Sequence, residues 1–520
     1  MTGLVFEARS PIVTSAPNRA DIACFVGFVH RRASQIPDSV YDWLREQEWR
    51  SIKPISTQLD DLLDVPIPID DWDVFDLLFA WEQRIVTQNS DGTVILGSSY
   101  LGAAVRSFFA QGGRKCYVVR VGDPLSVLTD RSQKLLKLDK LIPGYPHRVN
   151  ASPIDRQTWQ GIGHILGLPD VSFLCLPDLP DLVSADPVPL DPKIKLPPKR
   201  EVFVPCSEPL PETEEDAQVV RRVSAPRCDE GGYQQWVNSL WLVADWISRE
   251  QREIQLVAAV PMPQKGSAAD TDLLQFLLNS GVLSQRLNRS LIGLSSAFVQ
   301  LVYPWVRSPG SVRLPEQLES PDAVLAGILA RNALSRGAFR SIANLHLADV
   351  YDVYPILNRS QTQQPHLDNP QESFVSHNLL QRVSLLGETP DGLRVLSDVT
   401  TSLDENYRPA SINRLTSVIV RAARRLGETV LFEPGGDRLW RQLRDQLNSL
   451  MLALLQSGAL QGATPEEAFL VRCDRSTMTT ADLDNGRVIT EIQFNPAMPI
   501  EQITVVLAMD EGGQVSLISR

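Results

Sequence analysis

Residues 432–494 read FEPGGDRLWRQLRDQLNSLMLALLQSGALQGATPEEAFLVRCDRSTMTTADLDNGRVITEIQF, and the signals in this stretch decide the fold. Apolar residues recur at intervals of three and four in its first half, which predicts one amphipathic helix over residues 437–459. Two glycines precede this helix and Gly458 closes it, as glycines commonly do at helix ends. The apolar stripe consists of Leu439, Trp440, Leu443, Leu447, Leu450, Met451 and Leu454.

The second half of the same stretch predicts a short helix, a turn and a strand. Residues 464–467, TPEE, have the pattern of a capping box with proline at the first helical position. Residues 484–486, DNG, predict a turn, and the alternation in RVITEIQF predicts a half-buried strand. One face of that strand carries Val488, Thr490, Ile492 and Phe494. A last strand is predicted over 503–509. Because the local signals agree, we expect a compact C-terminal domain.

The rest of the chain alternates between predicted helices and buried strands. Residues 21–29, DIACFVGFV, form a short apolar run that is typical of a buried strand. Residues 100–121 combine an apolar helix, two glycines that stop it and a second buried strand. A similar unit is predicted over 157–176, and residues 233–260 predict a helix followed by a strand. This alternation favours a mixed α/β fold, and 520 residues are enough for two to four domains.

Proline content marks the boundaries between these parts. Eleven prolines fall within residues 176–230, which therefore predict a long surface excursion and no persistent helix or strand. Residues 1–20 contain apolar residues interrupted by Pro11 and Pro17, which is typical of an extended arm. The predicted division is an N-terminal arm (1–20), an α/β domain in two parts (21–175 and 231–375) that flank the Pro-rich excursion (176–230), a C-terminal domain (376–500) and a C-terminal strand or arm (501–520).

Composition excludes several classes of function. The formal net charge of −12 argues against binding to nucleic acid, which depends on neutralising phosphates. The six cysteines include no CxxC pair, so neither a zinc site nor a disulfide framework is predicted. The N-terminus lacks the pattern of a signal peptide, and no run of eighteen apolar residues occurs, so we expect a cytoplasmic protein that is neither Sec-exported nor inserted in a membrane.

Catalytic motifs give only one alternative worth naming. The phosphate-loop, dinucleotide and nucleophile-elbow motifs are all absent from the sequence. Residues 92–102, GTVILGSSYLG, place glycine and serine before a helix, where an α/β enzyme could bind a phosphate. Isolated His147 and His164 are more simply structural. Asp474, Asp482 and Asp484 do not match a calcium loop and are better explained as turn and helix-cap residues. We therefore predict no catalytic residue, no metal ligand and no cofactor.

Three arginines recur at every third position of the predicted 437–459 helix: Arg438, Arg441 and Arg444. They could form an ordinary solvated face. They could equally form a basic strip that docks against an acidic surface of a partner. The sequence leaves both interpretations open.

Several segments closely resemble the contractile tail sheath family of phage tails and related injection systems. The resemblance is strongest over 432–494. It extends to YLGAAVRSFFAQGGRKCYVVRV (100–121), to VQLVYPWVRSPG (299–310), to SPDAVLAGILARNALSRGAF (320–339) and to the opening strand DIACFVGFV. The resemblance implies a C-terminal sheath-type α/β domain, extended terminal arms and an inserted outer domain.

The resemblance also implies a structural function and not an enzymatic one. Sheath subunits polymerise as stacked six-subunit rings around an inner tube, and contraction drives the tube through a target envelope. The implied partners are further copies of this chain, the inner tube protein, and baseplate and terminal cap proteins. Terminal arms would pair by strand addition with neighbouring subunits, through Val5 and Phe6 and through Ile503, Val505 and Leu507. The 437–459 helix, with Arg438, Arg441 and Arg444, would dock toward the tube.

Two features depart from the family pattern. The start, MTGLVFEARSPIV, lacks the family's PGVY-like segment and the glutamates after it, and the Pro-rich excursion is atypical. Both leave room for a sheath-like accessory protein near the baseplate or the cap. The sequence does not distinguish a phage tail from an extracellular or cell-anchored injection system, nor does it identify the target, payload or trigger.

Overall fold

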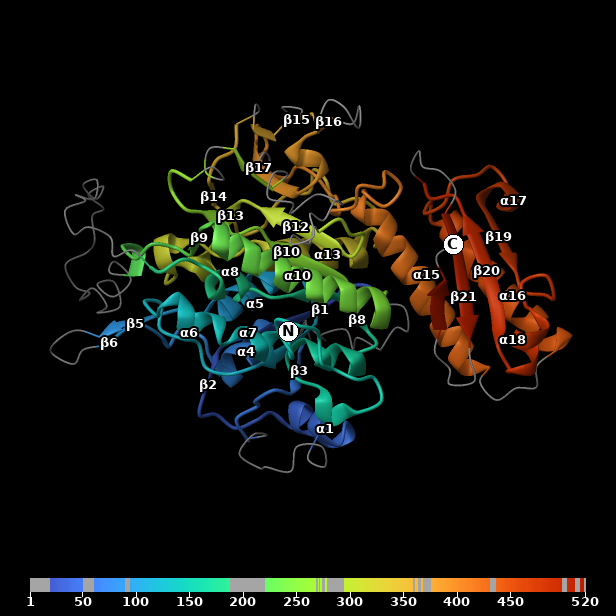
Figure 1. Ribbon diagram of the computed structural model, residues 1–520, viewed down its shortest axis with the longest axis horizontal. Coiled ribbons are helices and arrows are strands. Elements are labelled where there is room, and N and C mark those ends of the chain that lie inside the picture. The colour runs from blue at the N-terminus through green and yellow to red at the C-terminus, as the bar shows by residue number, and fades with distance from the viewer. Residues whose placement is uncertain are drawn as a thin grey trace, which may run out of the picture.

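The computed structural model describes a large α/β body and a smaller C-terminal domain, with the helix α15 (Ala410–Thr429) running between them (Figure 1). The described residues are 19–49, 60–88, 94–187, 220–267, 270, 272–273, 276–277, 294–358, 361–362, 366–367, 376–430, 436–497, 503–509 and 515–518. No helix among them is long and apolar enough to cross a membrane.

An eight-stranded sheet forms the centre of the body. Its order is β18-β17-β12-β10-β8-β1-β7-β3. The strands are β18 (Gly392–Val395), β17 (Ser384–Thr389), β12 (Val299–Tyr303), β10 (Gln255–Ala259), β8 (Val171–Cys175), β1 (Ile22–Gly27), β7 (Cys116–Arg120) and β3 (Pro66–Ile69). The six inner strands are parallel, and only the two edge strands run antiparallel to their neighbours.

Helices cover both faces of this sheet, as a parallel sheet requires. Strand β1 shows why, because its side chains alternate between two cores. Ile22, Cys24 and Val26 pack in the core that includes α10 (Glu230–Glu250), whereas Ala23 and Phe25 pack in the core of α5 (Tyr100–Ala110) and α13 (Asp322–Ser335). The continuous apolar run DIACFVGFV is therefore a strand buried on both faces, as predicted.

Shorter elements surround the sheet. The strands are β2 (His30–Arg31), β4 (Phe79–Ala80), β5 (Arg84–Gln88), β6 (Val94–Gly97), β9 (Arg227–Cys228), β11 (Met262–Pro263), β13 (Trp305–Arg307), β14 (Asp352–Tyr354), β15 (His366–Leu367) and β16 (Ser376–His377). The helices are α1 (Asp38–Glu46), α4 (Trp72–Leu78), α6 (Arg131–Leu135), α7 (Leu138–Leu141), α8 (Leu179–Leu182) and the 3-10 helices η1 (Arg156–Thr158), η2 (Gly161–Gly167), η3 (Pro309–Ser311), η4 (Pro315–Gln317) and η5 (Leu379–Gln381).

The C-terminal domain is an antiparallel sheet covered by two long helices. Its strands are β19 (Phe469–Arg472), β20 (Val488–Phe494), β21 (Ile503–Met509) and β22 (Val515–Ile518), in that order across the sheet. Its helices are α15, α16 (Asp437–Gln456), α17 (Pro465–Ala468) and α18 (Thr480–Asp484). Residues of α15, α16 and β20 share one apolar core, in which Ile419, Met451 and Ile492 are fully buried.

The structure confirms most of the elements predicted from apolar spacing. α16 spans most of the helix predicted over 437–459, and α5 and β7 form the helix and strand predicted over 100–121. The alternation in β20 is also confirmed, since Val488, Thr490, Ile492 and Phe494 are buried while the residues between them are partly exposed.

Some predictions differ from the structure. The surface excursion predicted over 176–230 is wrong at its ends, because residues 176–184 are buried in the core of the body and α8 and β9 lie within that range. Residues 161–167 form a 3-10 helix, because Gly161, Gly163 and Gly167 leave too little helix propensity for a regular α-helix. The C-terminal domain is predicted to begin at residue 376, but β17 and β18 belong to the sheet of the body, because β17 pairs with the distant strand β12. The predicted capping box at 464–467 does not form: the Thr464 side chain makes no cap bond, and Glu467 accepts a hydrogen bond from the amide of Ala463 instead (2.9 Å).

Candidate assembly surfaces

The amphipathic helix α16 presents its arginines away from the domain core. Leu439, Leu443 and Leu447 are buried against the sheet and the loops beside it, because apolar residues recur every three to four positions. Arg438 and Arg441 are exposed, and Arg444 is partly exposed. The only side-chain hydrogen bond described for these three goes from Arg441 Nε to the carbonyl of Asp437 (3.1 Å), within the described residues. Arg444 Nε also lies 3.8 Å from Asp445 Oδ1, so Arg438 and Arg441 are the two more open to a partner.

Strand β19 adds a fourth arginine that the sequence interpretation missed. Arg472 is exposed on β19, which packs beside α16. Asp474 follows this strand, and its pKa is lowered by hydrogen bonds from Ser476 and, further, by the cations of Arg444 and Arg472. Arg444 and Arg472 thus lie close enough to act on one carboxylate. The pattern FLVR, in which Arg472 alternates with the buried Val471, was the signal that could have identified it. We call Arg438, Arg441, Arg444 and Arg472 the basic surface.

The predicted arm residues of the C-terminus lie on β21, within the domain's own sheet. The register pairs Ile503 with Phe494, Val505 with Ile492 and Leu507 with Thr490. β22 pairs with the other side of β21 and ends the sheet. In this single chain the C-terminal segment therefore adds strands to its own domain. Val5 and Phe6 lie outside the described residues.

Helix α15 has two faces of opposite character. One face is apolar and packs in the C-terminal core through residues such as Leu415 and Ile419. The other face carries arginines that bind the body: Arg414 pairs with Asp398 through two contacts of 3.0 and 2.7 Å, and Arg424 pairs with Glu253. The joint between the domain and the body is thus largely polar, whereas the contact within the domain is apolar.

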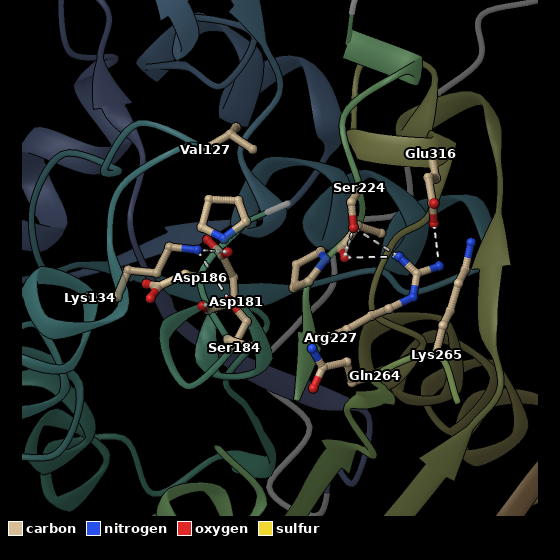
Figure 2. A pocket seen from close by; sticks show the side chains of 14 residues that line it. Val127, Lys134, Asp181, Ser184, Asp186, Ser224, Arg227, Gln264, Lys265 and Glu316 are labelled. Atoms are coloured by element: carbon tan, nitrogen blue, oxygen red, sulfur yellow. Dashed lines mark hydrogen bonds and ion pairs between the residues drawn. The ribbon is translucent and has the colours of Figure 1, made fainter. Parts of the chain in front are cut away.

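A cavity of about 310 Å³ lies where the Pro-rich excursion leaves the body and returns to it (Figure 2). On one side, Lys134 contacts Asp181 (2.9 Å), which also binds the buried Arg84 (2.6 Å). Burial alone would raise the pKa of Asp181, but the two cations hold it down to about 2. On the other side, Arg227 pairs with Glu316 (2.6 Å). These charges satisfy one another, so the two groups are structural ion pairs in the wall of the cavity.

The turn proposed for the enzyme alternative is filled by protein. Ser98 and Ser99 are buried, and the Ser99 hydroxyl accepts from the amide of Gly102, which caps α5. The amide of Ser98 donates to the carbonyl of Arg313 (2.9 Å). A Cβ at Gly102 would come within 2.3 Å of the Trp81 Cβ, so the Trp81 side chain packs directly on the first turn of α5. The described part of this segment, residues 94–102, therefore packs closely against the rest of the protein.

The other ionisable residues noted in the sequence have local structural roles. His164 is buried, and its Nε2 lies 3.0 Å from Asp64, while His147 is exposed on a separate loop. Asp482 forms a capping box with Thr479, and Asp474 accepts from the amide of Ser476 (2.7 Å). Within the described residues, no group of three or more His, Cys, Asp or Glu side chains could hold a metal ion.

The fold was compared with those of known proteins. No protein-family model matches the sequence, and no curated protein matches it. Solved structures do match. The anti-feeding prophage baseplate, six-fold symmetrised, matches at 18% identity and a TM-score of 0.54, covering 96% of each chain. The same baseplate in the contracted state matches at 15% identity and a TM-score of 0.55, again over 96% of each chain.

A third match is the helical sheath of the anti-feeding prophage in the contracted state. It is 18% identical, has a TM-score of 0.50, and covers 96% of this chain and 97% of that chain. Over nearly its whole length, the chain therefore has the fold of proteins from the baseplate and helical sheath of the anti-feeding prophage, which is the fold that its resemblance to the contractile sheath family implied.

Proposed function

We propose that this chain is a structural subunit of a contractile sheath, which polymerises as stacked six-subunit rings around an inner tube and contracts to drive that tube through a target envelope. The observation that carries the proposal is the match over 96% of both chains, since it includes the body, the C-terminal domain and the long helix between them. If the likeness reflected only a shared catalytic site, we would expect it to be confined to the domain that carries the site.

The C-terminal domain supports a role in assembly. Its sheet ends in two strands from the chain terminus, so an exchange of β21 and β22 between subunits would keep every backbone hydrogen bond that the strands make now. Residues 1–20 and 501–520 are the proposed arms. The basic surface is the proposed contact with an inner tube protein of acidic surface. We further propose assembly in the cytoplasm, without a catalytic step or a cofactor.

A second candidate is a sheath-like accessory protein next to the baseplate or cap. Two of the matching structures are baseplate structures, at TM-scores of 0.54 and 0.55. The unusual N-terminus and Pro-rich excursion point the same way. Such a protein would form one ring or bind the end of a sheath, but it would not elongate.

Negative-stain electron microscopy tests both candidates. The protein is imaged alone and after mixing with its presumed inner tube partner. Long hollow cylinders support the sheath subunit. Single rings or end-bound particles support the accessory protein. A monomer under both conditions, with no binding to tube or sheath ends, contradicts both.

A further inference from the structure

Helix α15 contacts the beginning and the end of the described chain. Its C-terminal half lies beside β8 and the first described residues of the N-terminus, where Arg421 is 5% exposed. The same helix contacts β21 and β22, which contain the last described residues. One helix therefore contacts both the first described residues and the last described strands.

Arg421 of α15 binds both Arg19 and the start of β8. Its guanidinium donates to the carbonyl of Arg19, to the carbonyl of Val171 (2.7 Å) and to the hydroxyl of Ser172 (2.9 Å). The last two groups lie at the start of β8, which is part of the rigid sheet. A planar guanidinium can bind several fixed acceptors at once, whereas a lysine ammonium on a flexible stem cannot match that geometry.

The side chain of Arg19 is held as well. Its Nε and Nη2 contact the two carboxylate oxygens of Asp21 at 2.9 and 2.6 Å, and Asp21 is 1% exposed. Arg19 is thus fixed through its carbonyl by α15 and through its side chain by the residue just before β1. Arg19, the first described residue, is therefore held at two points.

We propose that Arg421 is a positioning residue that anchors Arg19, at the N-terminal end of the described chain, to α15. Because α15 also contacts β21 and β22, this one helix connects the anchoring points of both termini. The consequence for assembly rests on the proposed function: if both termini tether neighbouring subunits, displacement of the N-terminal tether is transmitted through Arg421 to the C-terminal domain. Arg421 acts through Arg19 and through the carbonyls at the start of β8, and it needs no contact with another subunit.

Limited digestion with trypsin tests the anchor without reference to assembly. Cleavage after Arg19 needs local opening, because both its carbonyl and its side chain are bound. In Arg421→Lys the product that begins at Ala20 should appear about tenfold faster, which corresponds to the loss of one or two hydrogen bonds. The substitution keeps a trypsin site at this position and keeps the charge. Ser172→Ala, which removes one acceptor, should give a smaller acceleration.

Arg414→Lys is the matched control. Arg414 lies two helical turns earlier on the same face of α15 and is equally buried, but its partner is Asp398 and not the N-terminal segment. In the Arg414→Lys variant, the rate of cleavage after Arg19 should stay within about twofold of the wild-type rate. Equal acceleration in both variants would mean that α15 as a whole has loosened, and it would overturn the proposal. An unchanged rate in Arg421→Lys would overturn it too.

Electron microscopy of the same variants then tests the consequence. Arg421→Lys should form fewer and shorter polymers than the wild type and than Arg414→Lys, when all three are imaged at a temperature at which each is folded. Normal polymers from a variant that is cleaved rapidly would overturn the link to assembly. If the wild type itself does not assemble, the proposed function fails, while the digestion rates still decide whether Arg421 anchors the N-terminal root.

Discussion

Arg414 and Asp398 form a buried ion pair with two contacts, 3.0 and 2.7 Å long, that joins α15 to the body. Their side chains are 4% and 1% exposed. Burial alone would raise the pKa of Asp398, but the Arg414 guanidinium outweighs it, so the pKa lies below the ordinary value. The pair adds stability above the pKa of an unfolded aspartate, and this stability is lost as the pH falls through the lower folded pKa.

Breaking this pair should weaken the joint between the two parts of the molecule. Asp398→Asn leaves the Arg414 cation buried without its carboxylate, so we expect a loss of about 3 to 5 kcal/mol in the free energy of unfolding, measured by urea denaturation. Glu405→Gln, whose side chain is 77% exposed, is the control and should change stability by less than about 0.5 kcal/mol. An equally small effect of Asp398→Asn would show that the joint does not depend on this pair.

The ion pairs beside the cavity allow a comparison between two aspartates of one site. Asp181→Asn leaves the Arg84 and Lys134 cations buried together, and we expect destabilisation by about 3 kcal/mol or more. Asp186→Asn lies on the same cavity but is exposed, so its effect should stay below about 1 kcal/mol. Thermal unfolding of the two variants, followed by circular dichroism, measures the difference. Similar unfolding temperatures would contradict the structural role given to Asp181.

Stability should fall as the pH rises from 6 to 8. Burial raises the pKa of Asp178 to about 7 and that of Glu319 to about 7, although both accept hydrogen bonds. The folded state then holds protons that the unfolded state has released, so each group should cost about 1 kcal/mol across this range. Asp181 and Asp398 have lowered pKa values and stay ionised in both states here, so they add no slope.

The variant Glu319→Gln tests the contribution of Glu319 to this pH dependence separately from that of Asp178. Glu319→Gln keeps an oxygen that can accept the hydrogen bond from Ser107 and removes the titrating proton, so the pH dependence of the unfolding free energy should drop by about half. The exposed Glu388→Gln should leave the slope as in the wild type. If the slope of Glu319→Gln also equals that of the wild type, Glu319 does not titrate in this range.

A disulfide across β20 and β21 tests whether the C-terminal strands must leave their own domain. The register pairs Glu491 with Val506. The double variant Glu491→Cys with Val506→Cys should form an intrachain disulfide, because directly paired positions of antiparallel strands have suitable spacing. If strand exchange is needed, the oxidised protein should stay monomeric and should assemble after reduction, as seen by electron microscopy. Equal assembly of both forms would contradict strand exchange.

The basic surface can be changed without disturbing the core. Arg438→Glu with Arg441→Glu alters two exposed residues, so the unfolding temperature should stay near that of the wild type. Binding to the isolated inner tube, measured by co-sedimentation at two salt concentrations, should fall by at least tenfold because like charges would face an acidic tube. Arg148→Glu with Arg336→Glu, two exposed arginines of the body, is the charge-matched control and should bind normally.

The sequence by itself determined the elements whose signals are local. The spacing of leucines predicted α16, and the continuous apolar run of residues 21–29 predicted the buried strand β1. These patterns succeed because each element buries its own apolar face, whichever partner covers it. The quoted segments also carried a resemblance that predicted the fold over nearly the whole chain.

Only the tertiary structure decided which distant residues meet. It placed β17 and β18 in the sheet of the body, paired Arg414 with Asp398 across the joint and set Arg421 against Arg19, 402 positions away. It also buried Ser98 and Ser99, within the 92–102 segment that the sequence left open as a phosphate site. A buried charge is stable only beside its partner. In these pairs the partner is distant in sequence and comes near only when the chain folds, so no local sequence pattern identifies it.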